Sequence, residues 1–235
     1  MSIATRYEYV KRQVADAASA CGRDPREVRL IAVSKTVGAE GVGEAVAAGA
    51  HDFGENRPDH LLEVASVHPG ETWHFIGNIQ SRRIDDIVSA ASMVHSLCQD
   101  HHIDRFEKAA AVRGKMLDVL VEVNVSGEES KSGCAPDKAA ALVAHLRSCA
   151  HLRPRGLMTM APQGDLAAAR ACFEGLARLR DEIRRDLPSA AAACFDELSM
   201  GMSEDWREAV AAGATMVRIG RAVFDDAFEP PARSR

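Results

Sequence analysis

The stretch Arg29-Leu-Ile-Ala-Val-Ser-Lys-Thr-Val-Gly38 decides between the two folds that suit this chain. It opens as a short apolar run typical of a buried strand, and a helical pattern follows it at residues 40–48. An open, doubly wound sheet usually carries a glycine-rich turn directly after its first strand. The turn here reads Ser-Lys-Thr-Val-Gly instead, which favours a closed barrel over the open sheet.

Short apolar runs alternate with amphipathic stretches along the whole chain. The runs that predict strands cover residues 29–36, 51–56, 72–78, 93–98, 117–125, 152–160, 195–202 and 216–223. The helical patterns between them cover residues 40–48, 58–67, 80–90, 100–112, 136–150, 166–186 and 204–212. Apolar residues three or four positions apart between Ile3 and Cys21 predict one further helix ahead of the first strand.

Strict alternation of strands and helices requires parallel strands joined by right-handed crossovers. Eight such units in 235 residues predict an α/β fold, a single (β/α)8 TIM barrel with an extra N-terminal helix. No linker or low-complexity block interrupts the pattern, so we expect one domain over residues 1–228. The last seven residues include two prolines, and we expect a flexible tail over residues 229–235.

Composition narrows the class of protein. The formal net charge is −5 and the isoelectric point about 6.0, so nothing electrostatic predicts nucleic acid or an anionic membrane as a partner. No apolar run approaches the ~20 residues of a membrane-spanning helix, and the N-terminus lacks the apolar segment of a signal peptide. The six cysteines show neither CxxC nor metal-ligand spacing. We therefore expect a cytoplasmic protein with reduced thiols.

Lys35 is the first candidate for chemistry. It stands at the carboxyl end of the first expected strand, and the carboxyl ends of barrel strands form the active sites of this architecture. Burial of that strand predicts a desolvated amine, which is a better nucleophile than a solvated ammonium group.

A candidate phosphate site lies near the other end of the chain. The seventh strand ends in Met200-Gly-Met-Ser203, and Ser203 is expected to cap the helix that begins at Glu204. The eighth strand ends at Gly220-Arg221, where a glycine lets the backbone approach a phosphate closely. The alternative interpretation is that Ser203 only caps a helix and Gly220 only permits a turn.

Arg218 precedes Gly220 by two residues, so the two residues share one face of the last strand. If that face is the barrel interior, a guanidinium group lies in apolar surroundings and needs a partner. An ion pair with Glu122 of the fifth strand is one possibility. The other is a ligand atom, because barrel closure brings the last strand beside the strand of Lys35.

An amine, an anion cradle and an inward arginine together describe a site for pyridoxal 5'-phosphate (PLP). Lys35 would form a Schiff base with the aldehyde, Ser203, Gly220 and Arg221 would hold the phosphate, and Arg218 would donate to the pyridine nitrogen.

Seven ordered motifs carry a resemblance that covers nearly the whole chain. They are Ala32-Val-Ser-Lys-Thr36, Phe53-Gly-Glu-Asn56, Trp73-His-Phe-Ile-Gly77, Asn124-Val-Ser-Gly-Glu-Glu-Ser-Lys-Ser-Gly133, Gly156-Leu-Met158, Leu198-Ser-Met-Gly-Met-Ser203 and Val217-Arg-Ile-Gly220. Together they resemble the pyridoxal phosphate homeostasis protein family. The resemblance implies a PLP fold-type III barrel, similar to the N-terminal domain of alanine racemase.

The resemblance also implies roles for individual residues. It places PLP on Lys35, Arg218 at the pyridine nitrogen, and Ser203, Gly220 and Arg221 at the phosphate. Four further residues are expected to line the pocket, namely Asn56, His74, Met158 and Met200.

Two departures from the family pattern concern the pocket rim and the last turn. Arg57-Pro58-Asp59 follows Gly-Glu-Asn, where the family usually has an aromatic residue. Asp225 follows Ala222-Val-Phe224, where the family usually has a glycine.

The resemblance implies a carrier of PLP more than a catalyst. An arginine at the pyridine nitrogen keeps that nitrogen unprotonated, which weakens the cofactor as an electron sink. Alanine racemases take a second acid–base group, a tyrosine, from a separate β-domain, whereas the two tyrosines here, Tyr7 and Tyr9, lie in the leading helix. We expect a monomer that buffers PLP and passes it to PLP-dependent apoenzymes, free amines or amino acids.

Three alternatives remain open at this point. The chain could be an active PLP-dependent racemase, or an aldolase whose Lys35 traps a sugar phosphate. Lys131 could be the active amine, although its Gly/Ser-rich loop predicts an exposed and ordinary lysine. His95 and the pair His101-His102 lack metal-site spacing and are expected to be surface or core residues.

Overall fold

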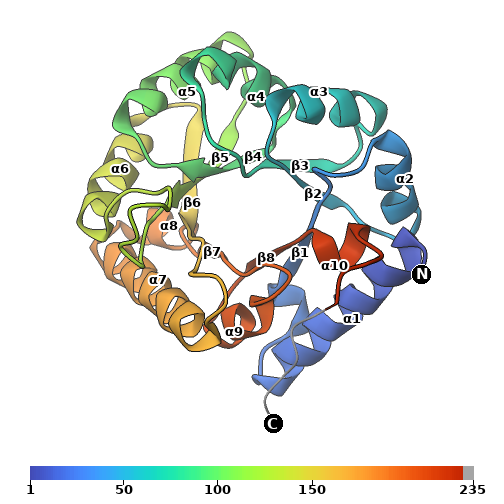
Figure 1. Cartoon of the computed structure of the whole chain (residues 1–235). Coiled ribbons are helices and arrows are strands. Elements are labelled where there is room, and N and C mark those ends of the chain that lie inside the picture. Colours follow the sequence, from blue (N-terminus) through green and yellow to red (C-terminus); the bar gives the residue numbers. More distant parts are fainter. Residues whose placement is uncertain (230–235) are drawn as a thin grey trace.

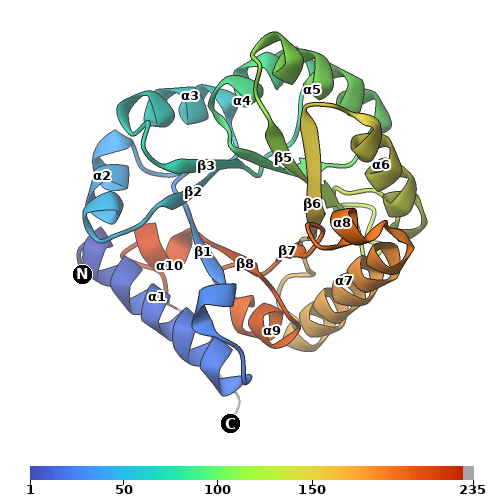
Figure 2. The same ribbon diagram turned by 180° about the vertical axis from the view of Figure 1, so that it is seen from behind.

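Eight parallel strands close into a barrel with helices around it, as Figures 1 and 2 show from opposite sides. The computed structural model describes residues 1–229, so all but the first residue of the expected tail at 229–235 lies outside the described residues. The strands are β1 (Arg29–Val33), β2 (Asp52–Glu55), β3 (Thr72–Phe75), β4 (Met93–Leu97), β5 (Leu117–Glu122), β6 (Leu152–Met158), β7 (Glu197–Ser199) and β8 (Met216–Ile219). Pairing of β1 with β8 completes the ring, which confirms the predicted (β/α)8 barrel over the open sheet.

Helices follow the strands in the expected order. They are α1 (Ile3–Ala20), α2 (Ala39–Ala47), α3 (Pro58–Val67), α4 (Ile84–Ala90), α5 (Asp100–Val112), α6 (Pro136–Ser148), α7 (Leu166–Asp186), α8 (Ser189–Ala192), α9 (Trp206–Ala211) and α10 (Arg221–Phe224), with 3-10 turns η1 (Pro25–Glu27) and η2 (Ser81–Arg83). The expected strand at 216–223 was wrong beyond Ile219, because the chain turns at Gly220 into α10. The apolar residues of α10, Ala222, Val223 and Phe224, fit a strand and a buried helical turn equally well.

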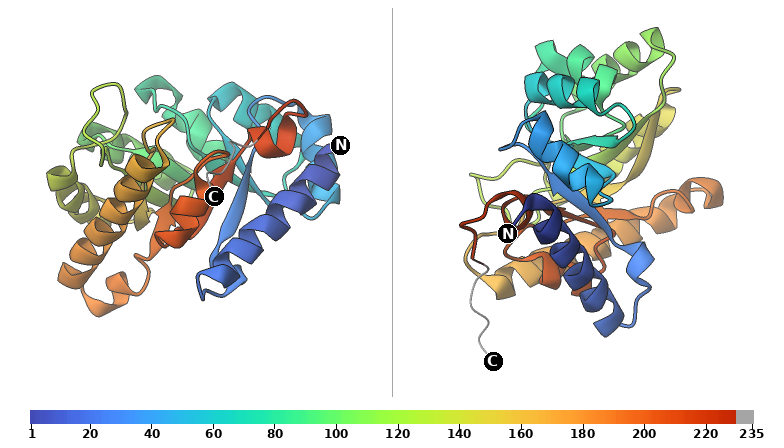
Figure 3. Two further views of the ribbon diagram at one scale, coloured as in Figure 1. Left: turned by 60° about the horizontal axis from the view of Figure 1, so that its bottom comes forward. Right: turned by 90° about the vertical axis from the view of Figure 1, so that its right-hand side faces the viewer.

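The leading helix α1 lies outside the ring and packs against α2, α9 and α10 (Figure 3). Ser2 caps it by accepting a hydrogen bond from the backbone N–H of Thr5. The Arg6 side chain donates to the carbonyl oxygen of Val223 at 2.7 Å. The extra helix therefore supports α10, the turn that follows the last strand.

Two apolar clusters stabilise the barrel. The larger lies between the strands and the helices, and the smaller fills the interior of the ring. The interior cluster consists of Ile31, Met93, Leu120, Met158 and Met216, with Met160 packed against it. Since alternate residues of a strand share a face, Arg29 and Val33 project to the same side of β1 as Ile31.

Gly156 permits the close approach of β6 to β7. It pairs with Glu197 and has a φ of 155°, and a Cβ added there would lie 1.9 Å from the carbonyl oxygen of Glu197. Because the clashing atom belongs to the backbone, it cannot move aside as a flexible side chain would.

We predict that Gly156→Ala lowers the free energy of unfolding by more than about 3 kcal/mol, because the strands must separate. Urea denaturation measures the change. Gly70→Ala is the matched control, since a Cβ at Gly70 would meet no atom within 4 Å. Equal unfolding midpoints for the two variants would contradict the strand contact.

Candidate functional site

A cavity of ≈ 560 Å³ opens at the carboxyl ends of the strands, within the size range of small-molecule sites. It gathers seven of the residues expected from the sequence, from five strands or the loops after them. They are Lys35, Asn56, Met158, Ser203, Arg218, Gly220 and Arg221. The sequence therefore predicted seven of the fifteen lining residues.

Lys35 lies in the turn after β1, two residues beyond the last residue of the strand. The turn is held by a hydrogen bond from the N–H of Val37 to the carbonyl oxygen of Ser34, and the Ser34 hydroxyl donates to Glu55 at 2.5 Å. Lys35 itself is exposed, so the expectation of an amine desolvated by burial was wrong. Among the described residues its ammonium group has no hydrogen-bond or ion-pair partner, which leaves it available to a ligand in the cavity.

Ser203 is buried, but it does not cap α9 as expected. The helix begins at Trp206 with Asp205 before it, and the Asp205 carboxylate accepts a hydrogen bond from the N–H of Met202. The Ser203 hydroxyl instead accepts a hydrogen bond from the N–H of Ala222 in α10, at 3.3 Å. Ser203 thus joins the loop after β7 to the turn after β8.

Gly220 follows the last residue of β8 and lies close to Val33, the last residue of β1. A Cβ at this position would be 3.1 Å from the carbonyl oxygen of Val33 and 3.3 Å from its Cβ. The missing side chain therefore keeps the two strands together beside the cavity, in addition to exposing backbone to a ligand.

Arg221 extends over this segment and forms an ion pair with Glu204, which also lines the cavity. Its guanidinium group also lies 5.2 Å from the ring centroid of Phe228. Both charged side chains of the pair are partly exposed. An anion entering the cavity would compete with Glu204 for Arg221.

Arg218 is the buried cation of the site, with 4% of its surface exposed. Its guanidinium group donates to the Ser199 hydroxyl at 2.7 Å and to the carbonyl oxygen of Thr159 at 3.0 Å. The ion pair with Glu122, left open by the sequence, is not formed. Burial lowers the pKa of Arg218 to about 10, so the side chain keeps its positive charge at neutral pH.

Glu122 is buried without a partner for its Oε1 atom. Burial raises the pKa of this carboxyl group to about 7, although the positive charge of Arg218 acts in the opposite direction. A buried carboxylate without a hydrogen bond is costly, so protonation accompanies folding over a wide pH range.

His74 and Met200 were wrongly expected to line the cavity. His74 is fully buried below the cavity, between Asp52 and His95. Met200 belongs to the apolar cluster between strands and helices. Strand alternation explains why Met200 faces away from the barrel interior, because its neighbour Ser199 faces the interior and contacts Arg218.

Several lining residues were missed. They are Val33, Ile76, Gly77, Asn78, Met160, Gln163, Met202 and Glu204. Residues two positions apart in an expected strand share a face, so Lys35 could have indicated Val33 as a lining residue. Met158 could have indicated Met160 in the same way. The others lie in loops whose paths follow no sequence period.

Lys131 does not line the cavity, and its amine donates to the carbonyl oxygen of Ala161 at 3.2 Å. The two departures from the family pattern have structural roles outside the lining. Pro58 begins α3 and Asp59 pairs with Arg83, while the Asp225 carboxylate accepts a hydrogen bond from the N–H of Ala227.

Within residues 1–229, no helix is both long enough and apolar enough to cross a membrane.

Known proteins resemble this chain over nearly its whole length. The family model described as "Alanine racemase, N-terminal domain" matches residues 8–227. The pyridoxal phosphate homeostasis protein of Pseudomonas aeruginosa is 43% identical over 228 residues, which cover 95% of each chain. That of Vibrio cholerae is 36% identical over 233 residues, or 96% of each chain.

Solved structures extend the comparison. PipY of Synechococcus elongatus, solved with PLP bound, has a TM-score of 0.82 and 31% identity, covering 95% of this chain and all of the other. D-threonine aldolase of Filomicrobium marinum has a TM-score of 0.72 over 97% of this chain and 62% of its own, at 18% identity. The second likeness concerns the fold alone.

The raised pKa of Glu122 predicts a pH-dependent stability difference. Below the ordinary pKa of 4.5, the Glu122 carboxyl group makes its full contribution to the free energy of unfolding. That contribution is lost as the pH rises through about 7, the pKa of the group in the folded protein. Glu122→Gln lacks this loss. Its stability relative to the unmodified protein should therefore rise by about 2 kcal/mol between about pH 5.5 and about pH 8.

Urea denaturation at the two pH values measures this difference. The control Glu129→Gln changes an exposed carboxylate in the loop after β5 and should show the same small stability difference at both pH values. A pH-independent difference for Glu122→Gln would contradict the buried, protonated carboxyl group.

Proposed function

This chain belongs to the pyridoxal phosphate homeostasis protein family, and we propose that it holds PLP on Lys35 and carries or buffers that cofactor. The observation that carries the proposal is one cavity lined by the amine of Lys35, the buried guanidinium group of Arg218 and the Ser203–Arg221 cradle, with no partner for that amine within residues 1–229. PLP brings an aldehyde that condenses reversibly with amines.

The residues fit this group by their depth in the barrel. Arg218 pairs with Ile31, Gly220 lies beside Val33, and Lys35 follows one step nearer the mouth. In PLP the aldehyde stands opposite the ring nitrogen, and the phosphate arm is attached next to the aldehyde. A deep nitrogen donor with an amine and a phosphate cradle near the mouth matches that order.

Each residue has a proposed part in holding PLP. Lys35 supplies the amine of a Schiff base, and Arg218 donates a hydrogen bond to the pyridine nitrogen. Ser203, Gly220 and Arg221 hold the phosphate by hydroxyl, backbone and guanidinium groups. Asn56 and Met158 line the pocket around the ring.

The lining supports a carrier over a racemase. A racemase needs a second acid or base on the far face of the cofactor. Among the described residues that line the cavity, the only carboxylate is that of Glu204, which is paired with Arg221. Tyr7 is buried in α1, where its hydroxyl contacts the carbonyl oxygen of Gly49.

The exposure of Lys35 suits exchange of the cofactor with an incoming amine. A free amino acid, or a lysine of a PLP-dependent apoenzyme, can reach an aldehyde carbon bound near the mouth without displacing buried side chains. We propose these amines as the acceptors, and a monomer as the active form.

We predict that Lys35→Ala loses the visible absorbance band of the Schiff base, while the phosphate cradle retains weaker PLP binding. Borohydride reduction of the unmodified protein, followed by peptide mass mapping, should place the adduct on Lys35. Lys131→Ala is the control and should keep the band. An adduct on another lysine, or a band that persists in Lys35→Ala, would refute the assignment.

The carrier role is tested separately with the loaded protein. Mixed with a PLP-dependent apoenzyme, it should restore that enzyme's activity, while an amino acid incubated with it keeps its configuration by chiral chromatography. Steady racemisation would overturn the carrier proposal in favour of the enzyme.

Glu204→Gln should tighten PLP binding by up to about fivefold, because exposed ion pairs contribute about 0–1 kcal/mol and Arg221 would be released to the phosphate. Fluorescence titration with PLP measures the dissociation constant. Glu208→Gln, the same change in α9 outside the cavity lining, should leave the constant unchanged. Equal constants for both variants would exclude competition between Glu204 and the phosphate.

A further inference from the structure

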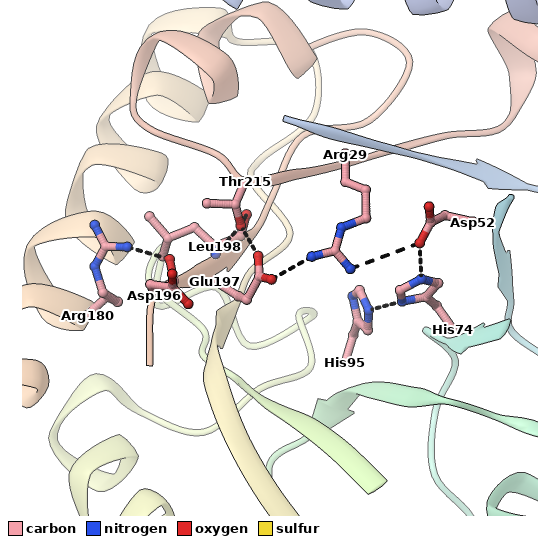
Figure 4. Close-up of polar contacts among 9 residues, drawn as sticks. All are labelled: Arg29, Asp52, His74, His95, Arg180, Asp196, Glu197, Leu198 and Thr215. Carbon is pink, nitrogen blue, oxygen red and sulfur yellow. Dashed lines mark hydrogen bonds and ion pairs between the residues drawn. The ribbon is translucent and has the colours of Figure 1, made fainter. Parts of the chain in front are cut away.

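A continuous chain of hydrogen bonds crosses the barrel interior beneath the cavity. The Arg218 guanidinium group bonds the Ser199 hydroxyl at 2.7 Å, and Ser199 Oγ lies 2.8 Å from Nδ1 of His95. Nε2 of His95 lies 2.9 Å from Nδ1 of His74, whose Nε2 lies 3.0 Å from Oδ1 of Asp52. Figure 4 shows the portion of this chain from His95 through His74 to Asp52.

Ion pairs anchor the lower end of the chain. Arg29 lies 4.0 Å from Asp52 and 2.6 Å from Glu197 (Figure 4). Thr215 donates its hydroxyl to the other oxygen of Glu197 at 2.5 Å. A carboxylate such as that of Asp52 can only accept hydrogen bonds, and here it lies between Arg29 and His74.

One arrangement of hydrogens satisfies both ends and leaves both rings neutral. Arginine only donates, so the Ser199 oxygen accepts from Arg218, and in this arrangement the Ser199 hydroxyl donates to Nδ1 of His95. His95 then carries its hydrogen on Nε2 and donates to Nδ1 of His74. His74 in turn carries its hydrogen on Nε2 and donates to Asp52, so the two rings share one tautomer.

Burial agrees with this assignment. His74, His95 and Ser199 are fully buried. Burial and the neighbouring His74 and Arg218 hold the pKa of His95 well below its ordinary value. A charged His95 would point an N–H at Ser199, whose oxygen would then receive two hydrogen bonds and leave its own hydrogen without this acceptor.

Neither histidine lines the cavity, so any effect on a ligand passes through Arg218. Arg218 has five N–H groups, and the bonds to Ser199 and Thr159 commit one on each of two nitrogens to the barrel interior. These two bonds fix the plane of the guanidinium group. Its remaining donors include those that face the cavity.

We propose that His74 and His95 are positioning residues, two neutral Nε2–H imidazoles that order Ser199 and thereby hold Arg218 for a ring-nitrogen acceptor. This inference rests on the proposed function, because it needs a ligand whose nitrogen meets Arg218. It goes further by giving the interior histidines a role that neither the cavity lining nor the apolar core explains.

The first test uses the unliganded protein. Long-range ¹H–¹⁵N NMR at neutral pH distinguishes the two tautomers and the charged form of each histidine, with signals assigned by the His74→Asn and His95→Asn variants. We expect a protonated Nε2 and an unprotonated Nδ1 on both rings. Ser96→Ala removes a buried hydroxyl outside the chain and should leave this pattern unchanged. An Nδ1–H tautomer or a charged ring at either position would overturn the inference.

The second test uses Ser199→Ala, which cuts the chain at its smallest residue. We expect the dissociation constant of PLP to rise about tenfold while that of inorganic phosphate changes little, because the phosphate cradle lies outside the chain. Equal weakening of PLP and phosphate would show a merely structural role and overturn the inference.

The two proposals fail in different ways. If the unmodified protein formed no PLP adduct on Lys35, the proposed function would fall, and the role of Arg218 with it. If the adduct formed but Ser199→Ala bound PLP normally, the positioning inference alone would fall.

Discussion

The parallel pairing of β1 with β8 is the contact on which the site depends. It sets Ile31 beside Arg218 and brings Val33 against Gly220. Residues that are almost 190 positions apart in sequence thereby share one wall of one cavity, with Lys35 above and Arg218 below. Without this pairing, the amine and the guanidinium group would lie at opposite edges of a sheet. The extra helix α1 supports the same region through α10.

The barrel interior holds polar groups in two different ways. From Arg218 to Asp52, each atom of the chain has a partner of the right kind, which makes burial tolerable. Glu122 lies in the same interior with its Oε1 atom unpartnered, and burial raises the pKa of this carboxyl group. The contrast shows that orientation, and not the mere presence of polar side chains, decides the cost.

The two ends of the proposed cofactor site differ in burial and in the number of their hydrogen-bond partners. Arg218 is held by buried partners, whereas Lys35 is exposed and unpartnered among the described residues. A rigid donor at the ring nitrogen with an open amine at the mouth favours selective holding together with ready exchange. That combination suits a protein that stores and releases a reactive aldehyde better than one that encloses a reaction from water.

The sequence by itself determined the barrel and seven of the fifteen residues that line the cavity. Alternating strand and helix patterns are local, so they survive without any knowledge of long-range contacts, and Lys35, Ser203, Arg218 and Gly220 could be placed at strand ends. Strand alternation also placed Arg218 and Gly220 on one face of the last strand, and the structure shows that Arg218 is buried. The ordered motifs then indicated the family, and with it Asn56 and Met158.

Only the tertiary structure decided which partners these residues have. Ser203 bonds α10 instead of capping α9, Lys35 is exposed, and His74 lies under the cavity. The chain through His95 and Ser199 joins strands far apart in sequence, and no period or motif encodes a contact between β4 and β7. Hydrogen bonds across a closed barrel depend on strand register and depth, which are set by packing of the whole ring.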